Sequence, residues 1–299
     1  MTNEASDADT SYAKAALRIL VILDTRTGQL GGVEISSDRF AQALLAAGHH
    51  IELLLVGQRV VFENAHRSSV PIHVVDAPGL ETVAQGTWDH FLRASCPDVV
   101  VLAKGWFDRR SRALDTAIIT KGCRYIVWEN HPPPHLAQTP IGRAVAILRG
   151  GWGGLQQRRE RQRHWAAADR VWCVSEYVHD KLVCDYGLDP SKAETIRTGV
   201  DLSHFYFDVG LKHAARTRWG IPHEACVIGA LGRLVPHKRI DLLLRAFALV
   251  MRQQDMNPTY CVIAGVGPES VALQRLAKEL NIEDFVRFLR WVEDPREAY

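Results

Sequence analysis

The stretch CVIGALGRLVPHKRIDLLLRAF, residues 226–247, joins an apolar segment typical of a buried strand to a segment with helical periodicity. From Ile240 to Met251, apolar residues recur at the spacing of one helical face. The turn between the two segments holds four basic residues: Arg233, His237, Lys238 and Arg239. A helix N-terminus carries partial positive charge, so cations are unfavourable there unless an anion lies between them. The four basic residues therefore indicate either a binding site for an anion or an ordinary basic segment exposed to solvent.

The same alternation of apolar strands and amphipathic helices continues along most of the chain. Strands rich in Val, Ile and Leu are expected over residues 17–24, 50–57, 73–76, 98–104, 125–130, 170–175, 226–232, 260–265 and 286–291. These segments are apolar on both faces, as parallel strands covered by helices must be. The pattern predicts an α/β fold built on doubly wound parallel sheets.

The alternation is interrupted over residues 198–225, a stretch with several glycines and a proline. We interpret this stretch as the passage between two Rossmann-like domains, residues 17–204 and 205–299, with the boundary near Phe205. A chain of 299 residues is long enough for two domains of ordinary size. Residues 1–16 are polar and acidic and lack the features of a secretory signal, so a flexible tail is expected there.

Composition narrows the classes of function. The formal net charge of +2 is too small to indicate a nucleic-acid partner. The six cysteines form no CxxC pair, which favours a set of reduced, buried thiols in a cytoplasmic protein over disulfides or zinc. No apolar stretch reaches the length of a membrane span. A P-loop and a GxSxG elbow are both absent from the sequence, and GVGPES follows a later strand than a dinucleotide-binding fingerprint would.

Several stretches resemble one enzyme family. GRLVPHKRIDLLLRAF and residues 262–294, VIAGVGPESVALQRLAKELNIEDFVRFLRWVED, resemble the C-terminal domain of the retaining GT-B glycosyltransferases, the class called glycosyl transferases group 1 or family 4. Arg290 stands where that family has a glycine before its tryptophan. Residues 28–57, 173–187 and 195–205 are similar to N-terminal segments of the family, although Thr198 replaces the usual asparagine.

The resemblance implies a GT-B fold, in which two Rossmann-like domains face each other across a cleft, with the second domain incomplete here. It implies transfer of a hexosyl group, with retention, from a nucleotide-diphospho-sugar to a glycan or lipid-linked acceptor. By position in the motif, Arg233 and Lys238 would hold the donor diphosphate with no obligatory metal or cofactor. Gly31 and Gly32 precede a predicted helix, where glycine lets backbone N–H groups approach an anion or a sugar.

Further site residues follow from the ends of two predicted strands. His131 matches a family histidine that faces the transferring sugar, and Glu129 is the neighbouring alternative as a catalytic residue. A loop histidine bonded to its own backbone is the competing interpretation of His131. The prolines that follow exclude a helical zinc pair with His135. Trp291 and Val292 resemble the place where the nucleobase edge meets backbone groups.

A basic stretch from Arg143 to Arg163 carries six arginines and one glutamate beside several apolar residues. One interpretation is a peripheral contact with anionic lipid or an anionic acceptor, and the other is a solvated helix. Glycines at 150–154 interrupt any continuous amphipathic face.

An acidic pair with the spacing E-x7-E, which the family uses to contact the donor sugar and ribose, is missing from this sequence. Its absence leaves a second hypothesis open, a catalytically inactive module that binds a nucleotide-sugar or another partner. In that case the side of the second sheet where further strands belong would be an unpaired edge.

Overall fold

The computed structural model describes residues 15–25, 31–57, 70–104, 111–131, 159–252, 258–292 and 294–298. The chain divides into two compact units, Met1–Thr198 and Gly199–Tyr299. This division lies a few residues ahead of the boundary that the sequence placed near Phe205. Each unit is an α/β structure with a parallel sheet, and the two are described separately below.

The first unit contains a parallel sheet of seven strands in the order β3-β2-β1-β4-β5-β6-β7. Its strands are β1 (Arg18–Asp24), β2 (His50–Val56), β3 (Ile72–Val75), β4 (Val99–Lys104), β5 (Arg124–Glu129), β6 (Arg170–Cys173) and β7 (Ala193–Thr195). The central strand β1 pairs with β2 and β4, and Val21 lies opposite Leu53 on one side and Val101 on the other. Because all seven strands run in the same direction, their C-terminal ends share one edge of the sheet.

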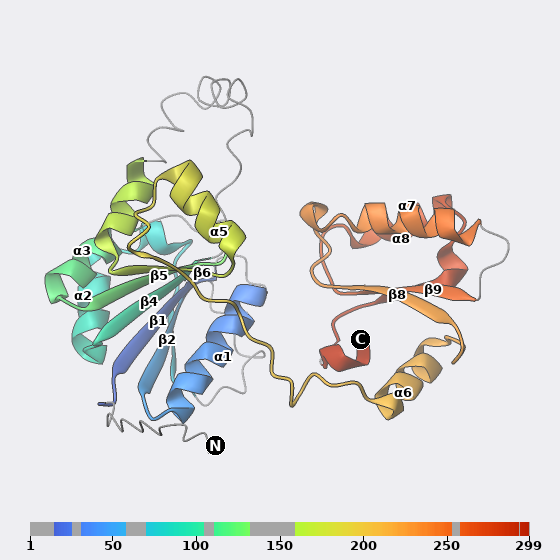
Figure 1. The fold of residues 1–299 in the computed structure, drawn as a ribbon, viewed down its shortest axis with the longest axis horizontal. Helices are drawn as coiled ribbons and strands as arrows, with labels where there is room; N and C mark the ends of the chain where they lie inside the picture. The colour runs from blue at the N-terminus through green and yellow to red at the C-terminus, as the bar shows by residue number, and fades with distance from the viewer. Residues whose placement is uncertain are drawn as a thin grey trace, which may run out of the picture. The chain divides into compact units, whose positions relative to one another are not determined.

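Helices cover both faces of this sheet (Figure 1). Helix α1 (Gly32–Ala46) packs on the face that carries Val21 and Leu53. The opposite face carries Leu20 and Ile22. Four helical segments cover it: α2 (Gln85–Ser95), α3 (Arg112–Lys121), residues 159–167 and α5 (Glu176–Asp180). Helix α5 continues into a π-helical turn over Lys181–Asp185. Alternate residues of each strand thus enter two separate cores, which explains why the strands are apolar on both faces.

The second unit contains a parallel sheet of three described strands, β8 (Cys226–Leu231), β9 (Thr259–Ala264) and β10 (Val286–Leu289), in the order β10-β9-β8. Helices α7 (Ile240–Met251) and α8 (Ser270–Glu279) cover one face, and α6 (Val209–Trp219) lies on the other (Figure 1). The predicted helical stripe is confirmed, because Leu244 and Phe247 of α7 are buried against Ile263 of β9.

Strand β8 is at the edge of this sheet as described, and it is the most exposed of the three strands. Val227 and Leu231 keep 37% and 39% of their surface exposed, whereas five of the six residues of β9 are buried. The outer backbone groups of β8 have no strand partner among the described residues. Among the described residues, β8 is therefore an unpaired edge of this sheet.

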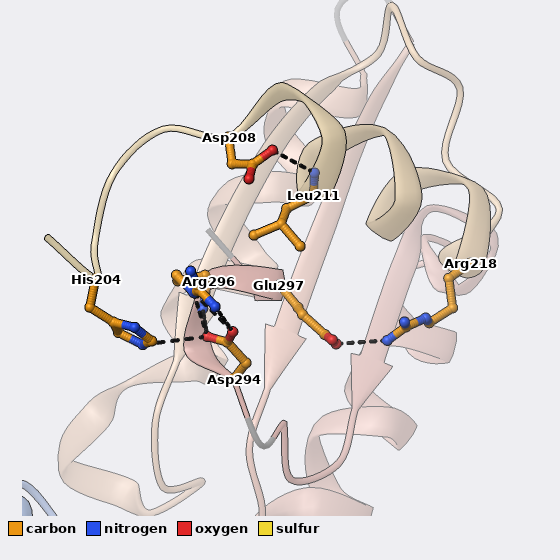
Figure 2. A network of polar contacts seen from close by, with 7 residues as sticks. All are labelled: His204, Asp208, Leu211, Arg218, Asp294, Arg296 and Glu297. Carbon is orange, nitrogen blue, oxygen red and sulfur yellow. Dashed lines mark hydrogen bonds and ion pairs between the residues drawn. The ribbon is translucent and has the colours of Figure 1, made fainter.

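Polar contacts fix the last described turn of the second unit, Pro295–Ala298, beside α6 (Figure 2). Arg218 Nη1 of α6 lies 2.7 Å from Glu297 Oε2, and the Arg296 guanidinium holds Asp294 at 2.6 Å. His204 Nε2 lies 3.9 Å from the same Asp294 carboxylate. These contacts join the beginning and the end of this unit.

The cysteines correct one prediction. Cys96, Cys184 and Cys226 are exposed, so the expectation of a uniformly buried set is wrong. Only Cys173 and Cys261 are buried, and burial raises the pKa of Cys173 to about 12 and that of Cys261 to about 11. The exposed thiols lie at a helix end, in the π-helical turn and at the open edge, where local apolar pattern is a poor guide to burial.

Candidate functional site

The basic turn, residues 232–239, follows β8 at the C-terminal end of the second sheet. Gly232 has a φ of 149°, which only glycine adopts readily, and it directs the chain out of the strand. Residues Pro236–Lys238 form one 3-10 turn, and Arg239 then takes a left-handed conformation with φ 52° before α7 begins. A separate turn thus lies between the strand and the helix, as the sequence predicted, and α7 begins one residue after Arg239.

The charges of the basic turn fall into two groups. Arg239 adjoins the helix and makes a two-pronged ion pair with Asp241, Nε to Oδ1 and Nη2 to Oδ2, both at 3.0 Å. This contact raises the pKa of Arg239 and lowers that of Asp241. Arg233 is half-buried and Lys238 is exposed, and neither makes an ion pair or a side-chain hydrogen bond within the described residues. Two cations of the turn therefore remain available to an anion.

The structure shows which of the basic residues lies at the N-terminus of α7. Arg239, rather than Arg233 or Lys238, occupies the unfavourable position at the N-terminus of α7, and Asp241 in the first helical turn offsets its charge. The two unpaired cations lie ahead of the helix on the preceding loop.

A second loop, residues 265–269, packs directly against the basic turn. Backbone hydrogen bonds run from Gly232 N to Ala264 O at 2.9 Å, from Leu234 N to Val266 O at 3.0 Å, and from Glu269 N to Leu234 O at 3.1 Å. A methyl group on Gly265 would overlap the Gly232 carbonyl, and one on Gly267 would overlap the Leu234 carbonyl. The two glycines are thus required by contact between backbones.

Gly267→Ala is expected to lower the free energy of unfolding of the second unit by roughly 1–3 kcal/mol, because the added methyl group forces the two loops apart. Hydrogen exchange of the β9 amides would report this loss. Gly199→Ala in the same unit is the matched control, since a Cβ there meets nothing within 4 Å. Equal protection of β9 in the two variants would contradict the packing argument.

A cavity of about 380 Å³ lies beside these loops, at the C-terminal ends of the three strands. It is lined by Leu234, Gly265, Val266, Gly267, Ser270, Gln274, Phe288, Leu289 and Arg290. Leu234 directly follows Arg233, so the cavity continues from the basic turn. Ligands of open parallel sheets bind outside the C-terminal ends of the strands, which is where this cavity opens.

Trp291 and Val292, predicted to lie on the nucleobase side, follow β10 immediately after the cavity residue Arg290. Trp291 is 58% exposed and Val292 is half-buried. Because β9 separates β10 from β8, the loops after these two strands lie roughly 10 Å apart.

In the first unit, Gly31 and Gly32 lie at the start of α1, as predicted. Gly31 caps the helix in an extended conformation, and its N–H donates to Glu34 Oε2 at 2.8 Å. One of the backbone donors that the sequence analysis offered to a ligand is therefore held by a carboxylate. A Cβ on Gly32 would meet nothing within 4 Å, so no contact in the described structure requires glycine at that position.

Glu129 ends β5 and is only 5% exposed. Its Oε1 accepts hydrogen bonds from Lys104 Nζ at 3.3 Å and from Trp165 Nε1 at 2.8 Å, and Lys104 is itself 3% exposed. A carboxylate engaged in this way is held in place rather than presented to a ligand. The arrangement favours a structural role for Glu129, which the sequence analysis considered as a catalytic alternative.

His131 lies two residues beyond β5 and is exposed. Strand β4 separates β5 from β1 in the sheet, so His131 and the loop before α1 leave the same edge roughly 10 Å apart. The backbone just before His131 is tied to the sheet, because Asn130 N donates to Lys104 O at 3.3 Å. His131 therefore keeps the position that the sequence predicted, at the edge where ligands of parallel sheets bind.

Sequence reasoning missed Lys104 and Trp165, which flank Glu129, and Ser270 and Gln274, which line the cavity. Much of the basic stretch, residues 143–158, lies outside the described part of the chain. Of its remaining arginines, Arg161 lies over the Tyr186 ring at 5.8 Å, and burial lowers its pKa.

No cluster of three or more His, Cys, Asp or Glu side chains suited to a metal ion occurs among the described residues. Within the same residues, no helix is both long and apolar enough to cross a membrane.

Comparison with known sequences gives two consecutive matches. The sequence model described as Glycosyltransferase Family 4 matches residues 30–204, and that described as Glycosyl transferases group 1 matches residues 212–299. A D-inositol 3-phosphate glycosyltransferase 2 from Catenulispora acidiphila is 38% identical over 139 residues, which are 44% of this chain and 32% of that protein. A D-inositol 3-phosphate glycosyltransferase from Saccharomonospora viridis is 37% identical over 42% of this chain and 30% of its own. The matches span about a third of these relatives.

Solved structures resemble most of this chain in fold. Anabaena HepE in complex with UDP-glucose matches 93% of this chain and 70% of its own with a TM-score of 0.70 at 15% identity. WaaG, a glycosyltransferase involved in lipopolysaccharide biosynthesis, matches 93% of this chain and 71% of its own with a TM-score of 0.61 at 16% identity. At such low identity the likeness concerns the fold alone.

Proposed function

This chain belongs to glycosyltransferase family 4, and on that basis we propose that it transfers a hexosyl group from a nucleotide-diphospho-sugar to a glycan or lipid-linked acceptor, with retention. The observation that carries the proposal is the pair Arg233 and Lys238. Both lack an anionic partner within the described residues, and both belong to a loop that continues into the cavity at the strand ends. The diphosphate of a nucleoside diphosphate would pair with these two cations, and its nucleoside would occupy the cavity.

In this proposal the basic turn stabilises the leaving group of the reaction. When the bond between the anomeric carbon and the diphosphate oxygen breaks, negative charge accumulates on the departing phosphate. Two fixed cations at that point lower the energy of the transition state without an obligatory metal ion. Arg233 can donate two parallel hydrogen bonds to phosphate oxygens, and Lys238 adds a compact charge.

The remaining site residues take roles in line with their placement. Trp291 and Val292 lie next to the cavity and would contact the base. His131 is exposed at a strand end of the first unit and would hydrogen-bond the transferring sugar or stabilise positive charge at the anomeric carbon. Gly31 and Gly32 would face the ligand through backbone groups, with Glu34 holding one of those donors until a ligand displaces it.

The relatives indicate which partners to test first. Two of them are named D-inositol 3-phosphate glycosyltransferases, and HepE was crystallised with UDP and with UDP-glucose. Uridine nucleotides and a polyol phosphate acceptor are therefore the first candidates for this chain. Contact with anionic lipid through Arg143–Arg163 and a cytoplasmic location stay predictions.

The proposal is tested with the purified chain in two steps. Isothermal titration with UDP, GDP, ADP and CDP measures binding, and incubation with radiolabelled nucleotide-sugars measures hydrolysis and transfer. We expect micromolar to millimolar binding of at least one nucleotide, and label in a product when an acceptor is supplied. If none of the four nucleotides binds, the proposal fails.

The same experiment tests the second hypothesis stated for the sequence. A nucleotide-sugar-binding module without transferase activity would bind the same nucleotides but release no labelled sugar. Binding without hydrolysis or transfer, across several donors and acceptors, would favour this module over the enzyme.

A further inference from the structure

We propose that the Arg290 side chain selects the base of the donor, so that nucleotides of uracil and guanine bind more tightly than those of adenine and cytosine. This inference rests on the proposed function, since it assumes that a nucleoside diphosphate occupies the cavity beside the basic turn. It concerns a residue at which this chain departs from the family pattern, which has glycine there.

The structure holds the backbone of Arg290 at the rim of the cavity. Gly265 N donates to both the Leu289 carbonyl and the Arg290 carbonyl, each at 3.1 Å. The end of β10 is thus attached to the loop that also packs against the basic turn. Arg290 is among the residues that line the cavity, and its side chain is exposed.

The guanidinium group of Arg290 has no ion pair or hydrogen bond within the described residues. Arg287, three residues earlier, differs because its guanidinium group is engaged in contacts with the protein. It donates to the carbonyls of Trp219 at 2.8 Å and Asp284 at 2.7 Å, and it lies 5.0 Å from the Tyr260 ring centroid. Arg287 therefore has a structural role, whereas the donors of Arg290 remain available to a ligand.

The cavity suits a flat, partly polar ring. Leu234, Val266 and Phe288 provide apolar surface, and the polar side chains of the lining are Ser270, Gln274 and Arg290. The Ser270 hydroxyl already donates to Gly267 O at 2.7 Å. Gln274 can both donate and accept, so its amide adapts to any base edge and discriminates little.

Arg290 differs from the other polar groups because a guanidinium only donates hydrogen bonds. Guanine offers the acceptors O6 and N7 on one edge, and uracil offers the carbonyl O4. Adenine shares the N7 acceptor with guanine, but adenine and cytosine place an amino donor where guanine has O6 and uracil has O4, and this donor would meet another donor. Among the described residues that line the cavity, Arg290 carries the only charge, so no carboxylate is present to accept from those amino groups.

The test is the dissociation constant of the full chain for UDP, GDP, ADP and CDP, measured by isothermal titration. We expect UDP and GDP to bind about five- to tenfold more tightly than CDP and ADP respectively, as for one charged donor meeting the right or wrong base edge. Arg290→Ala and Arg290→Gly should reduce this ratio to within about twofold. Arg275→Ala is the matched control, because it removes an equal charge from an exposed position on α8 outside the cavity lining.

The outcomes separate the inference from the proposed function. Binding of all four nucleotides with equal strength, or a preference that persists in Arg290→Ala, overturns the role of Arg290 and leaves nucleotide binding intact. A preference for CDP or ADP overturns it as well. Loss of the preference in Arg275→Ala to the same degree would show a general charge effect and also contradict the inference. The absence of any binding contradicts the proposed function itself.

Discussion

Replacing both Arg233 and Lys238 with alanine is expected to raise the dissociation constant for nucleoside diphosphates by about a hundredfold or more. A hydrogen bond to a charged group contributes about 1.5–3 kcal/mol, and the double variant removes at least two such bonds to phosphate. Neither side chain has a partner among the described residues whose loss would disturb the fold. Isothermal titration with the nucleotide that binds the intact chain measures the change.

Arg239→Ala is the matched control for this experiment. Arg239 lies in the same turn and carries the same charge, but Asp241 already neutralises it. Its removal should change the dissociation constant far less than the double substitution does. A similar loss in both variants would mean that the turn acts through its net charge alone. An unchanged dissociation constant in the double variant would exclude this turn as the diphosphate site.

Glu129→Ala is expected to lower the free energy of unfolding of the first unit by about 3–5 kcal/mol, because it breaks the buried ion pair between Glu129 and Lys104. The Trp165 N–H also loses its acceptor. The slowest-exchanging amides of β4 and β5 report the unfolding of this unit directly, so hydrogen exchange is the suitable measurement.

Two further variants make this result specific. Lys104→Met combined with Glu129→Leu removes both charges and should recover most of the lost stability, since a buried ion pair can be replaced by apolar groups at little cost. Glu176→Ala removes an exposed carboxylate that pairs with Arg197 and should change stability little. A loss in the double variant as large as in Glu129→Ala would indicate that lost packing, and not the broken ion pair, is responsible.

Most of the fold follows from the sequence. The nine predicted strands all occur, and comparison with HepE and WaaG confirms the GT-B class of two Rossmann-like units. Buried parallel strands leave a strong signal because both of their faces are apolar. Strand β7 was missed because its three residues, Ala193–Thr195, are too short and too polar to form an apolar run.

The candidate site was predictable in part. Local sequence was enough to find the basic turn, since its residues are neighbours in the chain. It could not show that Asp241 engages Arg239 rather than Arg233 or Lys238, because that choice depends on the turn geometry. Nor could it show that Glu129 is buried, because Lys104 and Trp165 lie 25 and 36 residues away.

The contact between the basic turn and the loop at 265–269 has a consequence for the thermodynamics of binding. With backbone hydrogen bonds joining the loops and no room for a methyl group between them, the surfaces that would meet phosphate and base form one preorganised body. A nucleotide arriving there would order few additional residues, so little conformational entropy would be lost on association. We therefore expect the entropic penalty of binding to arise mainly in the long side chains of Arg233, Lys238 and Arg290.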